Sequence, residues 1–128
     1  MRIIVIGYGR VGSQAVRRLS VENHHITVID KDRRVLERAA RDIRARVVFG
    51  DATDPELLRE AGAEKADVVF ALTRHENTNL MAAQIAKSLF KVPRVVAVVY
   101  DTQREQSFHA AGIETLERDR IAPAFGQA

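Results

Sequence analysis

The sequence predicts an α/β protein with a Rossmann-like, doubly wound parallel sheet of about six strands and helices on both faces. Two observations lead to this prediction. Apolar runs too short for helices alternate along the chain with stretches of helical spacing, and such alternation is typical of parallel strands joined by right-handed crossovers. A turn with three glycines also joins the first apolar run to the first helical stretch, where doubly wound sheets carry such a turn.

The strands are predicted from apolar runs that are continuous rather than alternating, which is typical of strands buried on both faces. Five clear runs cover residues 3–6, 26–29, 47–49, 68–72 and 95–99, and a weaker sixth covers residues 113–116. We therefore expect a buried sheet with its weakest strand near the C-terminus.

The helices are predicted from apolar side chains at helical spacing. These are Val11, Ala15 and Leu19, then Leu36, Ala39, Ala40 and Ile43, then Met81, Ile85 and Leu89. Asp54 followed by Pro55 predicts a helix start, and Thr73-x-x-Glu76 and Thr102-x-x-Glu105 are capping-box patterns. Gly62 and Gly112 are expected to end helices.

The domain organisation is expected to be simple, because no linker or composition break divides the chain. We predict one nucleotide-binding domain over residues 1–117 and an irregular tail over residues 118–128. The tail contains Pro123 and Gly126 and lacks a helical stripe, so the last helix of a complete fold is expected to be missing or irregular. We expect either an excised domain or a free-standing subunit.

Composition excludes several classes of protein. The 128 residues include no cysteine, which excludes disulfides, thiolate metal sites and cysteine nucleophiles. No apolar run approaches the ~20 residues that span a bilayer, so direct membrane insertion is not expected. Residues 1–50 carry 11 Lys/Arg against 5 Asp/Glu. We interpret this excess as a solvated face rather than a nucleic-acid site, since no aromatic residues are interleaved, although another anionic partner stays open.

The glycine turn is Gly7-Tyr8-Gly9-Arg10-Val11-Gly12. In this context Gly7 permits the tight turn, Gly9 lets a pyrophosphate approach the backbone, and Gly12 lets the helix pack on the strand. The amides at the helix start then face the phosphate. The turn predicts a phosphate site for a nucleotide.

Asp30 ends the second predicted strand, 18 residues beyond Gly12. A carboxylate there accepts hydrogen bonds from the ribose hydroxyls and disfavours a 2′-phosphate. We therefore predict an unphosphorylated ribose at Asp30, and Lys31 beside it is included among the cofactor-binding residues.

Arg10 is the least generic residue of the turn, and its planar charged fork suits a terminal phosphate or another anion. The alternative is a surface arginine at a helix start, which the positive end of the helix dipole disfavours slightly.

Further cleft residues are predicted where other strands end, because ligands of doubly wound sheets lie across the carboxyl ends of the strands. Asp51, Ala52 and Thr53 follow the third run, and Thr73 follows the fourth within a Leu72–His75 segment. We expect Asp51 and Thr53 to contact either the adenine or the loop beneath it. Thr73 is equally a helix cap and a ligand contact.

Catalytic machinery is not evident. His24 and His25 fall in a predicted surface loop, His109 on a helix, and only His75 near the cleft. Neither tyrosine is followed by lysine four residues on, and we expect no second domain that would hold a substrate against a nicotinamide. The sequence therefore predicts a binding site without a reaction.

Several spaced motifs also resemble one family. Gly-x-Gly-Arg-x-Gly, Val-Ile-Asp-x-Asp, Gly-Asp-Ala-Thr, Ala-Gly-Ala-x-x-Ala-Asp and Thr-Asn-Leu occur in this order over residues 7–80. They resemble the RCK-N, KTN or TrkA-N domain that regulates bacterial potassium transport. Residues 111–118 look like the branch attached to Kef-type potassium efflux antiporters.

The resemblance implies a cytoplasmic, non-enzymatic module, peripheral to the membrane through a partner, that senses NAD(H), AMP, ADP or ATP. It implies a homodimer or larger ring acting on a membrane potassium channel, transporter or antiporter. Glutathione control occurs in part of the Kef branch, and Arg10 and Asn79 are the positions to test for it. The alternative is an NAD-binding domain detached from an oxidoreductase, and a dimerising scaffold with a vestigial site is a further possibility.

Overall fold

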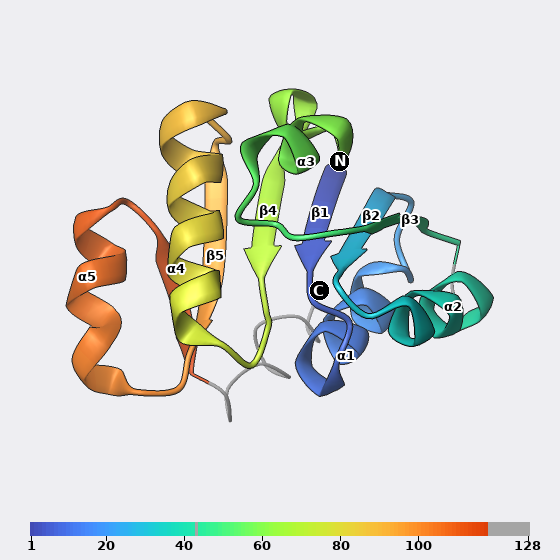
Figure 1. Ribbon diagram of the computed structural model, residues 1–128, viewed down its shortest axis with the longest axis horizontal. Coiled ribbons are helices and arrows are strands. Elements are labelled where there is room, and N and C mark those ends of the chain that lie inside the picture. Colours follow the sequence, from blue (N-terminus) through green and yellow to red (C-terminus); the bar gives the residue numbers. More distant parts are fainter. Residues whose placement is uncertain (43, 118–128) are drawn as a thin grey trace.

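The computed structural model describes residues 1–42 and 44–117. Its strands are β1 (Arg2–Ile6), β2 (His25–Asp30), β3 (Arg46–Phe49), β4 (Val68–Ala71), β5 (Arg94–Val99) and β6 (Glu114–Glu117). They form one parallel sheet in the order β3-β2-β1-β4-β5-β6, and Figure 1 shows neighbouring strands pointing the same way. The predicted doubly wound sheet is confirmed.

Five α-helices connect the strands: α1 (Arg10–Leu19), α2 (Arg33–Asp42), α3 (Pro55–Glu60), α4 (Glu76–Gln84) and α5 (Glu105–Ala110). Two short 3-10 turns, η1 (Ala63–Lys65) and η3 (Thr102–Arg104), accompany them, and a π-helical turn, η2 (Ile85–Leu89), continues α4. Ile43 and the predicted tail lie outside the described residues, so the division at residue 117 and the irregular last helix stay predictions.

Alternating side chains of each strand supply two hydrophobic cores, as the period of a strand requires. Ile3 and Val5 of β1 pack with buried residues of α1 and α2, including Val16. Ile4 and Ile6 pack on the opposite face with buried residues of α3, α4 and α5. The predicted helices on both faces are confirmed.

The predicted helix ends are partly right. Asp54 caps α3, because its Oδ1 accepts the Glu56 N–H at 3.0 Å with Pro55 at the first position. Gly62 and Gly112 follow helices with φ of +97° and +79°, the left-handed conformation that glycine adopts without strain. These predictions are confirmed.

The two capping boxes are wrong. Helix α4 begins after His75, which supplies no side-chain cap. The Thr73 hydroxyl donates to Asn79 Oδ1 at 2.6 Å and accepts the His75 N–H at 3.2 Å, one residue before the Glu76 of the predicted box. At η3 the capping group is Asp101, whose Oδ1 accepts the Gln103 N–H at 3.0 Å. An aspartate just outside the turn offers a stronger acceptor than the threonine that follows it.

Of the apolar side chains predicted on the third helix, Met81, Ile85 and Leu89, only Ile85 packs against the core. Met81 and Leu89 are 52% and 53% exposed. The buried positions are Asn79, Ala82, Ala83 and Ala86. Small side chains let α4 approach the sheet closely, and the π-helical turn shifts the helical phase near its end.

Two smaller predictions, one about the burial of a helix residue and one about the start of a strand, are also wrong. Ala40, expected on the apolar face of α2, is exposed, and His25, expected in a loop, is the first residue of β2. His25 pairs with Arg2 at the start of the β1–β2 ladder. Within the described residues, no helix is both long and apolar enough to cross a membrane.

Candidate functional site

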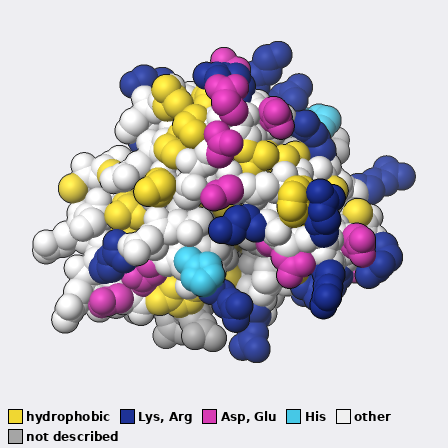
Figure 2. Space-filling model, viewed as in Figure 1, with side chains coloured by type: hydrophobic (Ala, Val, Ile, Leu, Met, Phe, Trp, Pro, Cys, Tyr) yellow, Lys and Arg dark blue, Asp and Glu magenta, His cyan; other side chains and the backbone are white. Residues whose placement is uncertain are grey.

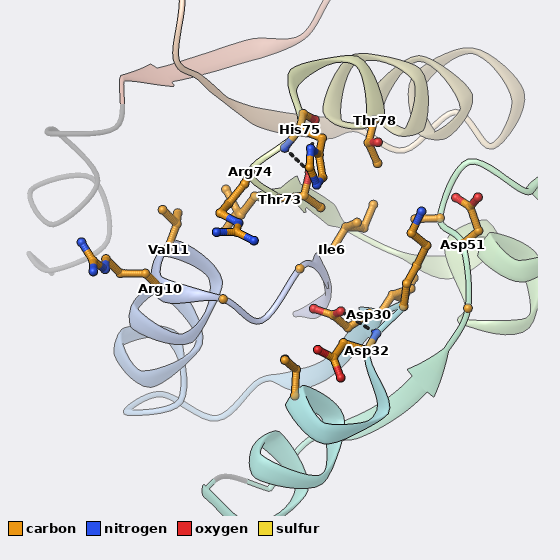
Figure 3. A pocket seen from close by; sticks show the side chains of 18 of the residues that line it. Ile6, Arg10, Val11, Asp30, Asp32, Asp51, Thr73, Arg74, His75 and Thr78 are labelled. Carbon is orange, nitrogen blue, oxygen red and sulfur yellow. Dashed lines mark hydrogen bonds between the residues drawn. The ribbon is translucent and has the colours of Figure 1, made fainter.

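A cleft of about 780 Å³ opens at the carboxyl ends of β1, β2, β3, β4 and β5, and Figure 3 shows it from close by. Its volume lies within the ~300–1,000 Å³ of small-molecule sites. Its lining residues are Ile6, Gly7, Gly9, Arg10, Val11, Ile29, Asp30, Lys31, Asp32, Val35, Gly50, Asp51, Ala52, Leu72, Thr73, Arg74, His75, Thr78 and Tyr100. The cleft lies where the strand order reverses between β1 and β4, as expected for a doubly wound sheet.

Gly7 and Gly12 are glycines because protein atoms crowd them. Gly7 has φ of +97°, and a Cβ on it would lie 3.0 Å from Thr73 Cγ2. A Cβ on Gly12 would lie 1.7 Å from the Gly7 carbonyl oxygen, which no rearrangement of side chains relieves. The start of α1 therefore packs directly on the turn that follows β1.

Gly9 differs from its two neighbours in the motif. A Cβ on Gly9 would have no protein atom within 4 Å, and the residue is exposed at the cleft. Packing therefore gives no reason for glycine at this position. The space is free for a group from outside the chain to approach the backbone.

Asp30 holds the turn from the end of β2. Its Oδ2 accepts the Tyr8 N–H at 2.8 Å, and its Oδ1 accepts the Asp32 N–H at 2.9 Å. A carboxylate has about four acceptor positions, so each oxygen can still accept a bond from a hydroxyl in the cleft. Asp30 thus fixes the backbone and keeps the capacity to bind a diol.

Asp51 shapes the loop after β3. Its Oδ1 accepts both the Thr53 hydroxyl at 2.7 Å and the Thr53 N–H at 2.9 Å. These two bonds, the hydroxyl bond foremost, lower the pKa of the Asp51 carboxyl below its usual range. Asp51 and Ala52 line the cleft, whereas Thr53, which bonds to Asp51, does not.

Two arginines lie at the cleft and differ in direction. In Figure 3 the Arg74 side chain extends from the loop after β4 toward the glycine turn, whereas the Arg10 side chain points away from Asp30. Both line the cleft and both are exposed. Arg74 therefore brings a cation above the turn, a role that the sequence suggested for Arg10.

A buried network supports the wall beneath Thr73. Asn79 Oδ1 accepts the Thr73 N–H at 3.0 Å and the Thr73 hydroxyl at 2.6 Å, while its Nδ2 donates to the carbonyls of Thr73 and Val98. The Tyr100 hydroxyl donates to the same Thr73 carbonyl at 3.1 Å. Asn79 is completely buried, so in this structure it positions Thr73 and does not face a ligand, contrary to the expectation for glutathione.

Nine of the twelve predicted cofactor-binding residues line the cleft. The other three are Tyr8, Gly12 and Thr53. Tyr8 has its ring in the core, with its hydroxyl 3.4 Å from Asp42 Oδ2, because the turn directs its side chain to the opposite side. Gly12 supports the turn from within α1.

Other cleft residues were missed as candidates. They include Tyr100, Val35 and Thr78. Tyr100 directly follows β5, so the rule that chose Thr73 also applies to it. Val35 and Thr78 lie in the first turns of α2 and α4, and only the helix starts seen in the structure bring them to the cleft. No cluster of His, Asp and Glu suited to a metal ion occurs among the described residues.

The fold and the site together define a Rossmann-type domain with an open cleft of nucleotide size at its glycine turn. The family model described as the TrkA-N domain matches residues 3–118. The chain belongs to the TrkA-N family, which confirms the resemblance of its motifs.

A curated relative supports this assignment at the level of sequence. The Trk system potassium uptake protein TrkA of Streptomyces coelicolor is 36% identical over 116 residues, which cover 91% of this chain and 52% of that protein. The chain therefore spans about half the length of this relative.

Solved structures show the same fold. A Kef C-terminal domain from Shewanella denitrificans in an AMP-bound form has a TM-score of 0.81 at 23% identity, covering 97% of this chain and 75% of that one. A GsuK channel bound to NAD has a TM-score of 0.80 at 20% identity, covering 90% of this chain and 21% of that one.

Proposed function

We propose that this chain is a regulatory domain or subunit that binds NAD(H) or an adenine nucleotide and controls a membrane potassium channel, transporter or antiporter. The observation that carries the proposal is the glycine turn, where Gly9 leaves open space beside the cleft and Asp30 faces it. Family membership and the NAD-bound and AMP-bound structures of the same fold support it.

In this proposal, different residues bind the phosphates, the ribose and the adenine of the nucleotide. The amides around Gly9 and the Arg74 guanidinium bind the phosphates, since a helix start and a cation both favour anions. Asp30 accepts the ribose hydroxyls, with Lys31 beside it at the rim. Asp51 and Ala52 lie on the adenine side, and Thr73 lies on the wall opposite.

The output we propose is a change of arrangement rather than a product. Asp30 and Asp51 both bond to backbone N–H groups, roles that suit a binding site better than acid–base chemistry. Nucleotide binding shifts an equilibrium between two arrangements of paired domains by its differential affinity for them. The rival reading, an NAD-binding domain detached from an oxidoreductase, requires turnover.

A thermal-shift panel with NADH, NAD, AMP, ADP and ATP tests the binding step. A ligand at ~100 times its Kd adds roughly 2.7 kcal/mol of stability, and that amount raises the Tm by several degrees. If none of the five nucleotides raised the Tm, the remaining hypothesis would be a dimerising scaffold with a vestigial site. Oxidation of NADH with small carbonyl compounds would support the oxidoreductase instead.

We further propose that the chain works in the cytoplasm as a homodimer or larger ring, next to the membrane through its transporter and without nucleic acid. Met81 and Leu89 are about half exposed on one side of α4 and η2 with Ile85 between them, and a second copy is the occupant we assign to this apolar stripe. Light scattering after size exclusion measures the assembly. Met81→Lys with Leu89→Lys should give monomers, and Gln84→Lys with Ser88→Lys on the same helical segment should not.

The transporter link needs its own test, because it concerns the whole protein. Potassium flux through a partner transporter, measured in proteoliposomes with the chain added, should depend on the bound nucleotide. The Gly9→Ala variant should remove that dependence while the chain still assembles.

A further inference from the structure

A second hollow, of about 460 Å³, lies between α1 and α2. Arg10, Ser13 and Arg17 line it from α1, and Arg38 and Asp42 line it from α2. The spacings of three, four and four residues place each set on one face of its helix. The α1–α2 groove, as we name it, meets the nucleotide cleft at Gly9 and Arg10, which line both.

The charge of the groove is unbalanced. Three guanidinium groups face one carboxylate in its lining, and Figure 2 shows Lys and Arg side chains gathered on the side of the molecule where α1 and α2 lie. Among the described residues, Arg59, Arg94 and Arg104 each have an ion pair, whereas the three groove arginines have none. Their charge is left for a partner from outside the chain.

One groove arginine is held in place by its own helix. Arg17 Nε donates to the Ser13 carbonyl at 3.3 Å, and its Nη2 lies 3.4 Å from Ser13 Oγ. A guanidinium has five N–H donors, so three of them are still free to bind a ligand. Arg17 therefore offers a partly fixed fork, which lowers the entropy lost when it binds an anion.

Asp42, which lines the groove from α2, contacts a buried tyrosine that precedes α1. The buried Tyr8 hydroxyl lies 3.4 Å from Asp42 Oδ2. Burial, and next to it Asp42, raises the pKa of the Tyr8 phenol, while Arg17 and Arg38 act in the opposite direction. Arg17 of α1 and Arg38 of α2 thus both act on the Tyr8 phenol, and both line the groove.

We propose that the α1–α2 groove is a second anion-binding site that takes a phosphate monoester. The net charge of the four charged groups in the lining is +2, because three arginines oppose one aspartate, and this matches a compact dianion. Arginine forks bind phosphate oxygens in pairs. The site does not depend on the proposed function, since none of its side chains except Arg10 lines the cleft.

The test is a titration of the ¹⁵N-labelled chain with glycerol 3-phosphate at constant ionic strength, followed by NMR. Shifts at Ser13, Arg38 and Asp42 that saturate are the expected result. Shifts confined to Gly7, Asp30 and Thr73 would place the phosphate in the cleft and overturn the proposal. Acetate, a monoanion, should bind at least tenfold more weakly.

Two double variants distinguish a specific phosphate site in the groove from nonspecific electrostatic attraction of the phosphate to the arginines of α1 and α2. Arg17→Gln with Arg38→Gln should weaken binding of glycerol 3-phosphate at least tenfold. Arg18→Gln with Arg41→Gln removes the same charge from the same helices outside the groove, and should change binding less than twofold. Equal losses in both pairs would overturn the proposal, and unchanged Tm values confirm that both are folded.

A further arm identifies the source of the phosphate. Sedimentation with vesicles containing phosphatidic acid compares a lipid headgroup with the free monoester. Binding to vesicles that needs Arg17 and Arg38 would assign the site to lipid, and binding of the free monoester alone would assign it to a soluble metabolite. Absence of both would overturn the proposal.

Discussion

The Asp30 carboxylate holds the glycine turn in place from the neighbouring strand, because its Oδ2 accepts the Tyr8 N–H at 2.8 Å. The same side chain also bonds the Asp32 N–H through Oδ1. One residue therefore both shapes the glycine turn and faces the position that we propose for the ribose.

Replacing Asp30 should damage stability and binding together. Asp30→Ala leaves two backbone donors without an acceptor, which costs about 1–3 kcal/mol of unfolding free energy. It should also weaken NADH and AMP at least about tenfold, since a charged hydrogen bond is lost, and reduce the preference for NADH over NADPH. Urea denaturation and calorimetric titration measure the two effects.

The control for Asp30 lies at the other end of β1. Asp67 Oδ2 accepts the Arg2 N–H at 2.8 Å, the same kind of bond outside the cleft. Asp67→Ala should lower stability without changing the Kd for NADH. An unchanged Kd in Asp30→Ala as well would show that the ribose assignment is wrong.

Alanine substitutions at two glycines of the same turn should have different effects, one on stability and the other on NADH binding. Gly12→Ala places a Cβ 1.7 Å from a backbone oxygen, and should cost more than about 3 kcal/mol or prevent folding. Gly9→Ala meets no protein atom, so its Tm should be within about 2 °C of the original, while NADH binds at least tenfold more weakly. Circular dichroism melts and titration separate them, and a Gly9→Ala variant that binds normally would contradict the phosphate assignment.

The Arg74 side chain should contribute to binding of the nucleotide phosphate and not to binding of the adenine base. Arg74→Gln removes the cation that extends over the turn, and should weaken AMP about tenfold or more. Binding of adenosine, which carries no phosphate, should be unchanged. Arg10→Gln should alter AMP binding less than about threefold, and a larger loss in Arg10→Gln than in Arg74→Gln would reverse their roles.

Much of this was predictable from sequence, and the parts that were not have physical reasons. Continuous apolar runs such as Val95–Val99 gave the strands, because burial on both faces leaves a clear signal. The glycine turn and Asp30 were found because their spacing reflects backbone geometry. The direction of Arg74 was not predictable, since a side chain's direction depends on the loop that carries it.

The buried face of α4 shows a second limit. Periodicity favoured the large residues Met81 and Leu89, yet the sheet contacts alanines and Asn79. Close packing between a helix and a sheet selects small side chains, and a buried asparagine is chosen for its hydrogen bonds. Hydrophobicity alone detects neither requirement.

Asn79 should therefore be among the most sensitive positions of α4. Asn79→Ala leaves the Thr73 N–H and the Val98 carbonyl without their partner, which should cost about 2–4 kcal/mol. Asn77→Ala, an exposed change on the same helix, should cost less than about 1 kcal/mol. Urea denaturation compares them, and similar losses in both would mean that the network is unimportant.

Lowering the pH should remove the contribution of the Asp51 carboxylate to the free energy of unfolding. Its pKa is lowered in the folded chain by the Thr53 bonds, so the stabilisation is complete above the ordinary carboxyl pKa of about 4. It is lost as the pH falls through the lower folded value. The stability difference between the original chain and Asp51→Asn should shrink below about pH 4, and Thr53→Val should raise the Asp51 pKa in a carbonyl-detected NMR titration.

The placement of the two tyrosines gives the chain an optical property. The sequence has no tryptophan and two tyrosines. The Tyr8 hydroxyl lies 3.4 Å from Oδ2 of Asp42, which lines the α1–α2 groove, and Tyr100 lines the cleft. Its near-ultraviolet emission therefore comes from Tyr8, which contacts a groove residue, and from Tyr100, which lines the cleft. Phenylalanine substitutions at either position would turn the chain into a label-free fluorescent reporter of the other, and reduced nicotinamide would be visible without tryptophan background.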